Sequence, residues 1–244
     1  EVVVEIREAE KSESEFEIDF DVPILYEDDS LLVVNKPPNL IVHSAPSVKE
    51  ATLVDWLKSR GISLSTISGE ERHGIVHRLD KGTTGAMVVA KNNFSHQKLS
   101  EQLSNRTMGR NYFAIVNMPL KEDISVELPL ARNPKNRLKM GIVENGKWAK
   151  TDFTKLKISK NEKEEFIEAK LHTGRTHQIR VHLLSLQRYI LGDELYGFGK
   201  NQKEFPHMLL HAHKIYFIHP KTEKRIEIDA PLSAEFQKYL DKNF

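Results

Sequence analysis

The stretch that decides the fold is His73–Lys91, HGIVHRLDKGTTGAMVVAK. Two apolar runs, Gly74–His77 and Ala86–Ala90, flank a polar loop, and we interpret both runs as extended segments. Asp80 then lies at the end of an apolar strand, where a loop of small residues begins. A rigid strand with small neighbours can aim a carboxylate at a substrate. The same carboxylate, followed by lysine and glycine, is also a common turn sequence, and spacing alone favours the turn.

The flanking sequence predicts an α+β fold with a mixed, largely antiparallel central sheet and flanking helices, because strands outnumber helices and come partly in runs. Residues 131–150, in contrast, resemble a basic loop. Strands are expected at Ser30–Lys36, Arg110–Val116, Thr151–Ile158, Glu165–Leu171, His213–His219 and Arg225–Ile228, and helices at Thr52–Arg60, Asn93–Asn105, Thr176–Leu186 and Ser233–Leu240.

The charge of the chain is unevenly distributed. The 244 residues carry a formal net charge of only +1, which at first argues against a nucleic-acid partner. However, residues 1–29 have a net charge of −10 and residues 30–244 a net charge of +11, so a basic body follows an acidic leader. The absence of cysteine excludes disulfides and thiolate chemistry and is compatible with the cytoplasm. No apolar run approaches the roughly 20 residues of a membrane span.

A second polar cluster lies in Leu171–His182, LHTGRTHQIRVH. Thr173 or Thr176 can cap a helix there. Arg175 and Arg180 are fixed cations suited to a carboxylate or a phosphate, and His177 shares a helix face with Arg180. A plain cationic helix is the alternative.

The histidine spacing argues against a metal site. His177 and His182 are five residues apart rather than four, with no acidic residue between them. His211 and His213 are better explained by packing or by a surface position than by a metal site. Tyr112 is an aromatic residue in an alternating strand, where core packing is the default role, although a tyrosine at a pocket can stack on a base or transfer a proton.

Taken together, the strings HRLDKGTTG, RNYFAIV, LHTGRTHQIRVHLLSL and GDELYG resemble the RluA-type family of RNA pseudouridine synthases, closest to the RluD/RluC branch. With ILYEDDSLLVVNKPPNLIVHS near the start, the resemblance covers about residues 23–240. It implies a sheet with a central active-site cleft and isomerisation of uridine to pseudouridine in RNA. It also implies that the enzyme needs neither a metal nor an organic cofactor.

The resemblance also implies roles for particular residues. Asp80 matches the essential aspartate, Tyr112 the tyrosine that lies against uracil, and Arg180 the basic partner of the aspartate. Arg78 matches the arginine that fills the gap left by the extracted base. Arg110 stands where many relatives have lysine, and we expect little effect from this difference. Further contacts with substrate or RNA are expected from His77, Thr84, Arg137, Lys139, Arg175 and His177.

Residues 23–244 are expected to form the catalytic domain, and residues 1–22 an acidic arm. Relatives of this branch often begin with an S4-type RNA-binding domain, whose last strand and linker the arm resembles. The branch indicates a monomer that modifies large-subunit ribosomal RNA, with transfer RNA as the alternative. The competing hypotheses are an RNA-binding or ribosome-assembly factor without essential catalysis, and a phosphate-binding or glycoside-cleaving protein.

Overall fold

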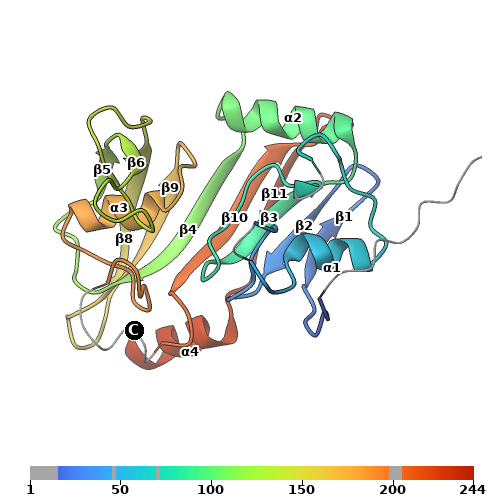
Figure 1. Cartoon of the computed structure of the whole chain (residues 1–244). Helices are drawn as coiled ribbons and strands as arrows, with labels where there is room; N and C mark the ends of the chain where they lie inside the picture. Colours follow the sequence, from blue (N-terminus) through green and yellow to red (C-terminus); the bar gives the residue numbers. More distant parts are fainter. Residues whose placement is uncertain (1–15, 46–47, 70–71, 198–204) are drawn as a thin grey trace, which may run out of the picture.

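A nine-stranded sheet runs through the residues that the computed structural model describes, which are 16–45, 48–69, 72–197 and 205–244 (Figure 1). Its order is β1-β2-β3-β10-β4-β9-β8-β5, with β11 on β10, and only the β3–β10 pair is parallel. This confirms the mixed, largely antiparallel sheet. The strands are β1 (Ile24–Glu27), β2 (Leu31–Lys36), β3 (Thr84–Ala90), β4 (Gly109–Val116), β5 (Ile124–Glu127), β8 (Lys150–Ile158), β9 (Glu165–Leu171), β10 (Leu210–Ile218) and β11 (Arg225–Asp229).

Helices α1 and α4 begin where their capping residues predict. Thr52 and Asp55 form a reciprocal capping box at the start of α1, and the Ser233 side chain accepts the Phe236 N–H at the start of α4. In the described ranges, no helix is long and apolar enough to cross a bilayer. The helices are α1 (Leu53–Ser59), α2 (Asn93–Ser104), α3 (Gln178–Ser185) and α4 (Ala234–Asn243).

The alternation of side chains along β4 divides the core between the two faces of the sheet. Tyr112 and Ala114 pack with residues of α1 and α3 on one face. Ile115 packs against Phe236 of α4 on the opposite face, together with Phe113. Helix α2 also covers this second face, through Leu99. The face covered by α1 and α3 therefore carries Tyr112 and, as described below, the cleft.

The segment Gly74–His77 is not a strand, contrary to our expectation. Only Ile75 forms a bridge, with Val89. The imidazole Nε2 of His77 accepts the backbone N–H of Val88 at 3.1 Å, so a side chain occupies a hydrogen-bonding position that a neighbouring strand would need. Asp80 consequently precedes β3 in an irregular segment rather than following a strand.

Two further expectations require correction. Residues 131–150 are not all loop, because β6 (Leu130–Arg132) and β7 (Met140–Ile142) form a small separate hairpin. Helix α3 begins at Gln178, after His177 in a left-handed conformation with no side-chain cap. Neither Thr173 nor Thr176 caps it. Instead, the Thr173 hydroxyl donates to the side-chain oxygen of Gln178 at 2.7 Å.

Most of the predicted acidic arm lies outside the described residues. In the part that the structure describes, Asp21 lies 3.5 Å from Arg60, just past the end of α1. Both side chains are more than half exposed, so this ion pair contributes little to stability. The division into an arm and a catalytic domain stays a prediction.

Candidate active site

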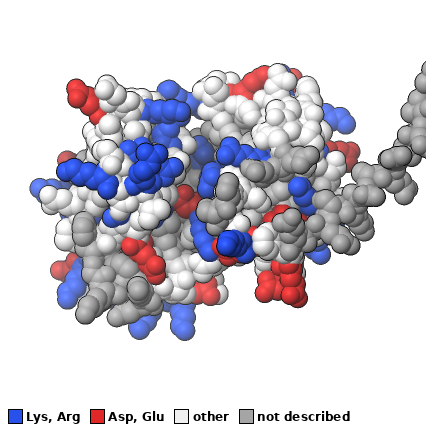
Figure 2. Space-filling model, viewed as in Figure 1, with Lys and Arg blue, Asp and Glu red and all other residues white. Residues whose placement is uncertain are grey.

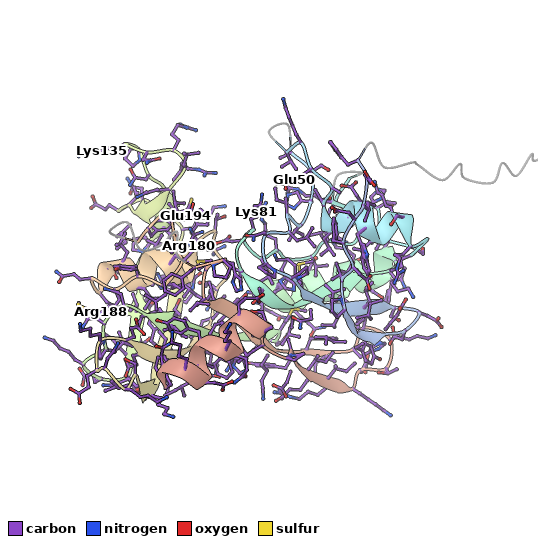
Figure 3. The ribbon with its side chains drawn as sticks, turned by 90° about the horizontal axis from the view of Figure 1, so that it is seen from below. Glu50, Lys81, Lys135, Arg180, Arg188 and Glu194 are labelled. Carbon is purple, nitrogen blue, oxygen red and sulfur yellow. The ribbon has the colours of Figure 1, made fainter. Side chains whose placement is uncertain are left out.

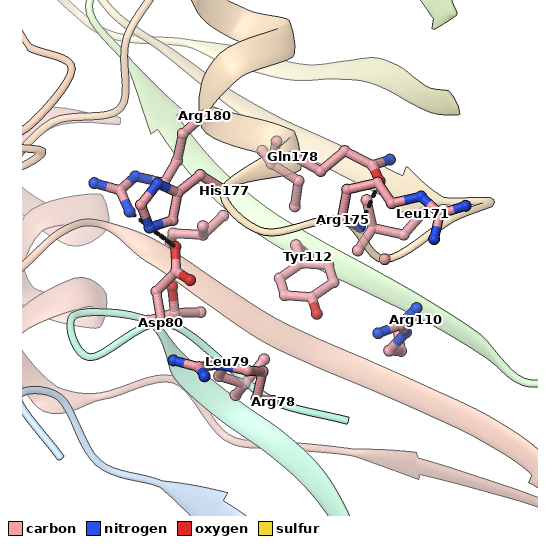
Figure 4. A pocket seen from close by; sticks show the side chains of 14 residues that line it. Arg78, Leu79, Asp80, Arg110, Tyr112, Leu171, Arg175, His177, Gln178 and Arg180 are labelled. Atoms are coloured by element: carbon pink, nitrogen blue, oxygen red, sulfur yellow. Dashed lines mark hydrogen bonds and ion pairs between the residues drawn. The ribbon is translucent and has the colours of Figure 1, made fainter. Parts of the chain in front are cut away.

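An open cavity lies between β4 and the start of α3 and is lined by Asp80, Arg110, Tyr112, His177 and Arg180 among others (Figure 4). A larger groove adjoins it and shares Asp80 and Arg180. Figure 3 shows Arg180 and Glu194 in one half of the molecule and Lys81 in the other, and all three line this groove.

Asp80 is held by a turn and by a buried lysine. The Thr83 N–H donates to the Asp80 carbonyl oxygen at 3.0 Å, which confirms the turn, while the catalytic role of Asp80 stays a prediction. The Lys36 ammonium is fully buried and donates to the carbonyl oxygens of Pro37, Leu40 and Lys81 at 2.8, 2.9 and 3.1 Å. Burial lowers the pKa of Lys36 to about 7, although the Asp80 charge opposes this. Lys36 thus fixes the Asp80 segment without a strand.

A chain of charges connects Asp80 to the protein interior. Arg180 donates from Nη1 to Asp80 Oδ2 at 2.8 Å, and from Nε and Nη2 to the two oxygens of Asp193, each at 2.8 Å. Burial lowers the pKa of Arg180, but the hydrogen bonds and charges of Asp193 and Asp80 outweigh it and raise the pKa above its ordinary value. Bidentate pairing fixes the guanidinium plane. One face of the cleft therefore holds an oriented carboxylate.

His177 and Tyr196 extend this arrangement toward the β6–β7 hairpin. His177 Nε2 lies 3.9 Å from Asp80 Oδ2, and its Nδ1 lies 2.9 Å from the Tyr196 hydroxyl. That hydroxyl accepts the Met140 N–H at 2.7 Å, and the Tyr196 ring lies 4.8 Å from the Arg180 guanidinium. Burial lowers the pKa of His177, partly opposed by the Asp80 charge. The imidazole is accordingly neutral near pH 7.

Tyr112 lies within the cavity, at the middle of β4, and is only 4% exposed. Among the described residues its hydroxyl has no hydrogen-bond partner, so it is available to a ligand. Burial raises the pKa of Tyr112, while the Arg110 charge lowers it and the Asp80 charge raises it. The phenol is therefore protonated at neutral pH and can donate a hydrogen bond.

Two predicted contact residues lie away from the cleft. His77 is buried, bonds to the backbone of Val88 and has a pKa lowered to about 3, first by burial and then by the Arg110 charge. Thr84 is buried as well, with its hydroxyl 2.7 Å from His211 Nδ1. Both support the sheet around β3, because His77 Nε2 and the Thr84 hydroxyl bond to groups within it. His213 also packs, stacked on Phe113.

The other predicted contacts lie at the cleft or on the hairpin. Arg78 is exposed and donates to His43 Nε2 at 3.1 Å, and Arg175 donates to the Trp148 carbonyl oxygen at 3.1 Å. Both line the cavity. Arg137 and Lys139 lie on the β6–β7 hairpin, in a region where Figure 2 shows Lys and Arg side chains gathered on the face viewed there.

Sequence reasoning missed Asp193 and the importance of Arg110. Asp193 lies in the GDELYG string, where an acid beside a glycine gave no hint of its partner. Arg110 is two residues before Tyr112 on a strand, and this spacing placed both side chains on the same face. The i, i+2 pattern was thus the available signal for Arg110.

A family model described as RNA pseudouridylate synthase matches residues 30–185. An RNA pseudouridine synthase of Helicobacter pylori (strain J99) is 52% identical over 235 residues, which cover 93% of this chain and 72% of that protein. Ribosomal large subunit pseudouridine synthase D of Zymomonas mobilis is 40% identical over 90% of this chain and 72% of its own length. These matches extend well beyond the cleft.

The fold comparison agrees. The solved structure of human RNA pseudouridylate synthase domain containing 1 matches with a TM-score of 0.71 and 26% identity, covering 87% of this chain and 84% of that one. The family model spans β2 to α3 and therefore includes Asp80, Tyr112 and Arg180. The chain belongs to the RNA pseudouridylate synthase family, and it is an enzyme that isomerises uridine to pseudouridine in RNA.

Proposed function

We propose that Asp80, Tyr112 and Arg180 carry the isomerisation, and that the target is a uridine of large-subunit ribosomal RNA. The observation that supports these roles is the hydrogen-bonded chain Asp80–Arg180–Asp193 beside a cavity that contains Tyr112. It presents an oriented carboxylate and an aromatic ring to one small ligand.

The target nucleotide has to leave its helix. The glycosidic C1′–N1 bond of a stacked nucleotide is out of reach, so the base is flipped into the cavity at a cost of a few kcal/mol. Arg78 lines the cavity and is exposed, which supports the role of this side chain in filling the gap left by the base. The basic side chains of the β6–β7 hairpin bind phosphates, which offsets the cost of flipping.

Asp80 acts on the sugar. Its Oδ2 is bonded to Arg180, which leaves Oδ1 to face the substrate. Oδ1 either bonds to C1′ or removes the proton from C2′ as the C1′–N1 bond breaks, and the electron pair of that bond stays with uracil. The cavity retains the detached base beside the sugar, so rejoining through C5 is favoured by proximity.

Tyr112 holds the base in place. Its buried ring offers a stacking surface, and its protonated hydroxyl can exchange a proton with the ring during the transfer from C5. No second acid lines the cavity within the described ranges, whereas glycoside hydrolysis uses a pair. The cavity is therefore suited to isomerisation rather than hydrolysis.

The choice of ribosomal RNA is supported by the relatives. Two of them, 40% and 36% identical, bear the name ribosomal large subunit pseudouridine synthase D. Mapping pseudouridine in cellular RNA with and without the gene tests the target. A position lost from large-subunit ribosomal RNA is expected, whereas loss confined to transfer RNA would contradict the proposal.

Release of tritium from RNA labelled at C5 of uridine tests the catalytic roles. Asp80→Asn is expected to abolish release and to leave RNA binding within about threefold of wild type. Asp29→Asn, an exposed aspartate outside the cleft, is the matched control and should behave as wild type. Substantial release by Asp80→Asn would exclude Asp80 as the acting carboxylate.

A further inference from the structure

Arg110 is a buried cation without a partner. The side chain is only 9% exposed, and it has no hydrogen bond or ion pair among the described residues. Its Nε is one of the few fully buried side-chain nitrogens that lack a hydrogen-bond acceptor. Burying an unpaired charge costs several kcal/mol. An unpaired guanidinium in this position indicates that a ligand accepts its hydrogen bonds.

The guanidinium is placed where a ligand can reach it. Arg110 and Tyr112 lie on one face of β4 and line the same cavity as Asp80. In Figure 4 the ring of Tyr112 lies between Arg110 on one side and Asp80 on the other. Gly174 makes room for Arg110, because a Cβ atom there would lie only 2.7 Å from Nη2.

The other arginines of this cavity are already engaged. Arg180 is shared by two carboxylates, whereas Arg78 and Arg175 donate to neutral acceptors at the cavity margin. Arg110 is the arginine of this cavity whose side chain has no hydrogen bond among the described residues, and it lies on the opposite side of Tyr112 from the carboxylate. A base stacked on Tyr112 would have its sugar toward Asp80 and its carbonyl oxygens toward Arg110.

We propose that Arg110 is a catalytic residue that donates to a uracil carbonyl oxygen and stabilises the negative charge that uracil acquires when the C1′–N1 bond breaks. In that step N1 keeps the electron pair, and the charge is shared with O2 and O4. In the same step Asp80 reacts with the sugar, through a bond to C1′ or removal of the C2′ proton, so this role of Arg110 depends on the proposed function. Arg110 keeps all its protons. When C5 joins C1′, Asp80 leaves C1′ or returns the proton to C2′, and charge neutrality is restored as the C5 proton passes to N1.

Single-turnover kinetics on a target RNA test this role. Arg110→Met is expected to slow C1′–N1 cleavage by about 10²–10³-fold, as removal of an oxyanion donor does, with the Kd for RNA within about threefold of wild type. Arg225→Met, an exposed arginine of β11 outside the cleft, is the control and should retain the wild-type rate.

A substrate with a better leaving group identifies what Arg110 binds. RNA with 5-fluorouridine at the target carries a base whose anion is already stabilised by fluorine. The factor by which Arg110→Met slows C1′–N1 cleavage should therefore be at least tenfold smaller with this RNA than with the uridine RNA. An equal loss with both RNAs would overturn the proposal. A weaker Kd with a shallower salt dependence and an unchanged bound rate would instead make Arg110 a phosphate contact.

Gly174→Ala gives a second test that does not delete the charge. The added Cβ displaces only the end of the flexible Arg110 side chain, so the fold is preserved while the guanidinium shifts. We expect an intermediate loss, again smaller with 5-fluorouridine. If Arg110→Met does not fold, as seen by thermal melting, Gly174→Ala decides. An inactive wild type or an active Asp80→Asn refutes the proposed function, whereas wild-type rates in the Arg110 and Gly174 variants refute only the role of Arg110.

Discussion

Asp193→Asn should weaken both the fold and the catalysis through Arg180. Asp193 is 1% exposed and accepts two hydrogen bonds from Arg180, and its Oδ1 also accepts the N–H groups of Leu195 and Tyr196. Asparagine has the same shape but only one acceptor oxygen, and its amide N–H₂ would face the guanidinium. Arg180 would then be buried with Asp80 as its sole carboxylate.

The magnitude follows from those contacts. Each hydrogen bond between charged groups contributes about 1.5–3 kcal/mol, and breaking a buried pair by removal of one partner costs about 3–5 kcal/mol. Because a domain of this size shifts by about 2–4 °C per kcal/mol, the Tm should fall by about 10 °C. A carboxylate misplaced by about 1 Å loses about 10²-fold in rate. The loss should appear in kcat rather than in KM, since Asp193 binds no substrate.

Urea unfolding and single-turnover isomerisation measure the two effects. Asp29→Asn is the matched control, because this aspartate is exposed and lines neither the cavity nor the adjoining groove. Its stability and rate should equal those of the wild type. The reasoning is refuted if Asp193→Asn unfolds within 1 kcal/mol of wild type and retains at least half of its kcat.

Three further perturbations act elsewhere in the structure. Burial lowers the pKa of His77 to about 3, so its contribution to stability is complete above the unfolded pKa of about 6.5 and is lost as the pH falls toward 3. At pH 5 the free energy of unfolding is lower by about 2 kcal/mol for this reason. Urea titrations at pH 7.5 and 5 should show that His77→Gln lacks this decrease, and an equal decrease in both proteins would exclude His77 as its cause. Tyr196→Phe leaves the Met140 N–H without its acceptor and should cost about 1–3 kcal/mol in thermal melts; an unchanged Tm would show that the hairpin is held by other contacts. Arg137→Glu combined with Lys139→Glu should weaken RNA binding and reduce the salt slope by about one unit for each lost phosphate contact; an unchanged slope would place the RNA elsewhere.

The elements that the sequence predicted well are those with local signals. Helix α1 was expected within one residue of its observed ends, because Thr52 and Asp55 form the capping box within one turn. Strand β2 was expected from its apolar run, and all but one of its six residues are buried. Such signals act between neighbours in the chain and therefore survive into the fold.

The elements that were predicted wrongly depend on contacts with residues that are distant in the sequence. The Gly74–His77 run is apolar like a strand, but His77 takes the Val88 N–H that a strand would pair with. The β6–β7 hairpin forms in a basic stretch with no apolar alternation, and Tyr196 anchors it through the backbone of Met140. Neither contact can be predicted from the local pattern of apolar and polar residues.

The candidate site shows the same division. Asp80 and Arg180 are 100 residues apart, and their pairing was expected only from the resemblance; the structure places them 2.8 Å apart. Asp193 could not be assigned as the third member, since its only mark was its place in GDELYG. His77 and Thr84 were also expected to contact RNA, yet His77 Nε2 and the Thr84 hydroxyl bond within the sheet.

The distribution of charge around Tyr112 ties the two proposals together. Asp80, Arg180 and Asp193 carry a net negative charge on one side of the cavity, and the unpartnered Arg110 carries a positive charge beyond the ring. The reaction separates charge in the same sense, with an electron-poor sugar carbon and an electron-rich base. Fixed charges of this kind cost stability in the empty protein but need no reorganisation during the reaction. The net charge of +1 for the whole chain does not reveal this arrangement, because opposite charges that lie on different sides of one cavity cancel in the sum. In the cavity they act on different ends of one breaking bond.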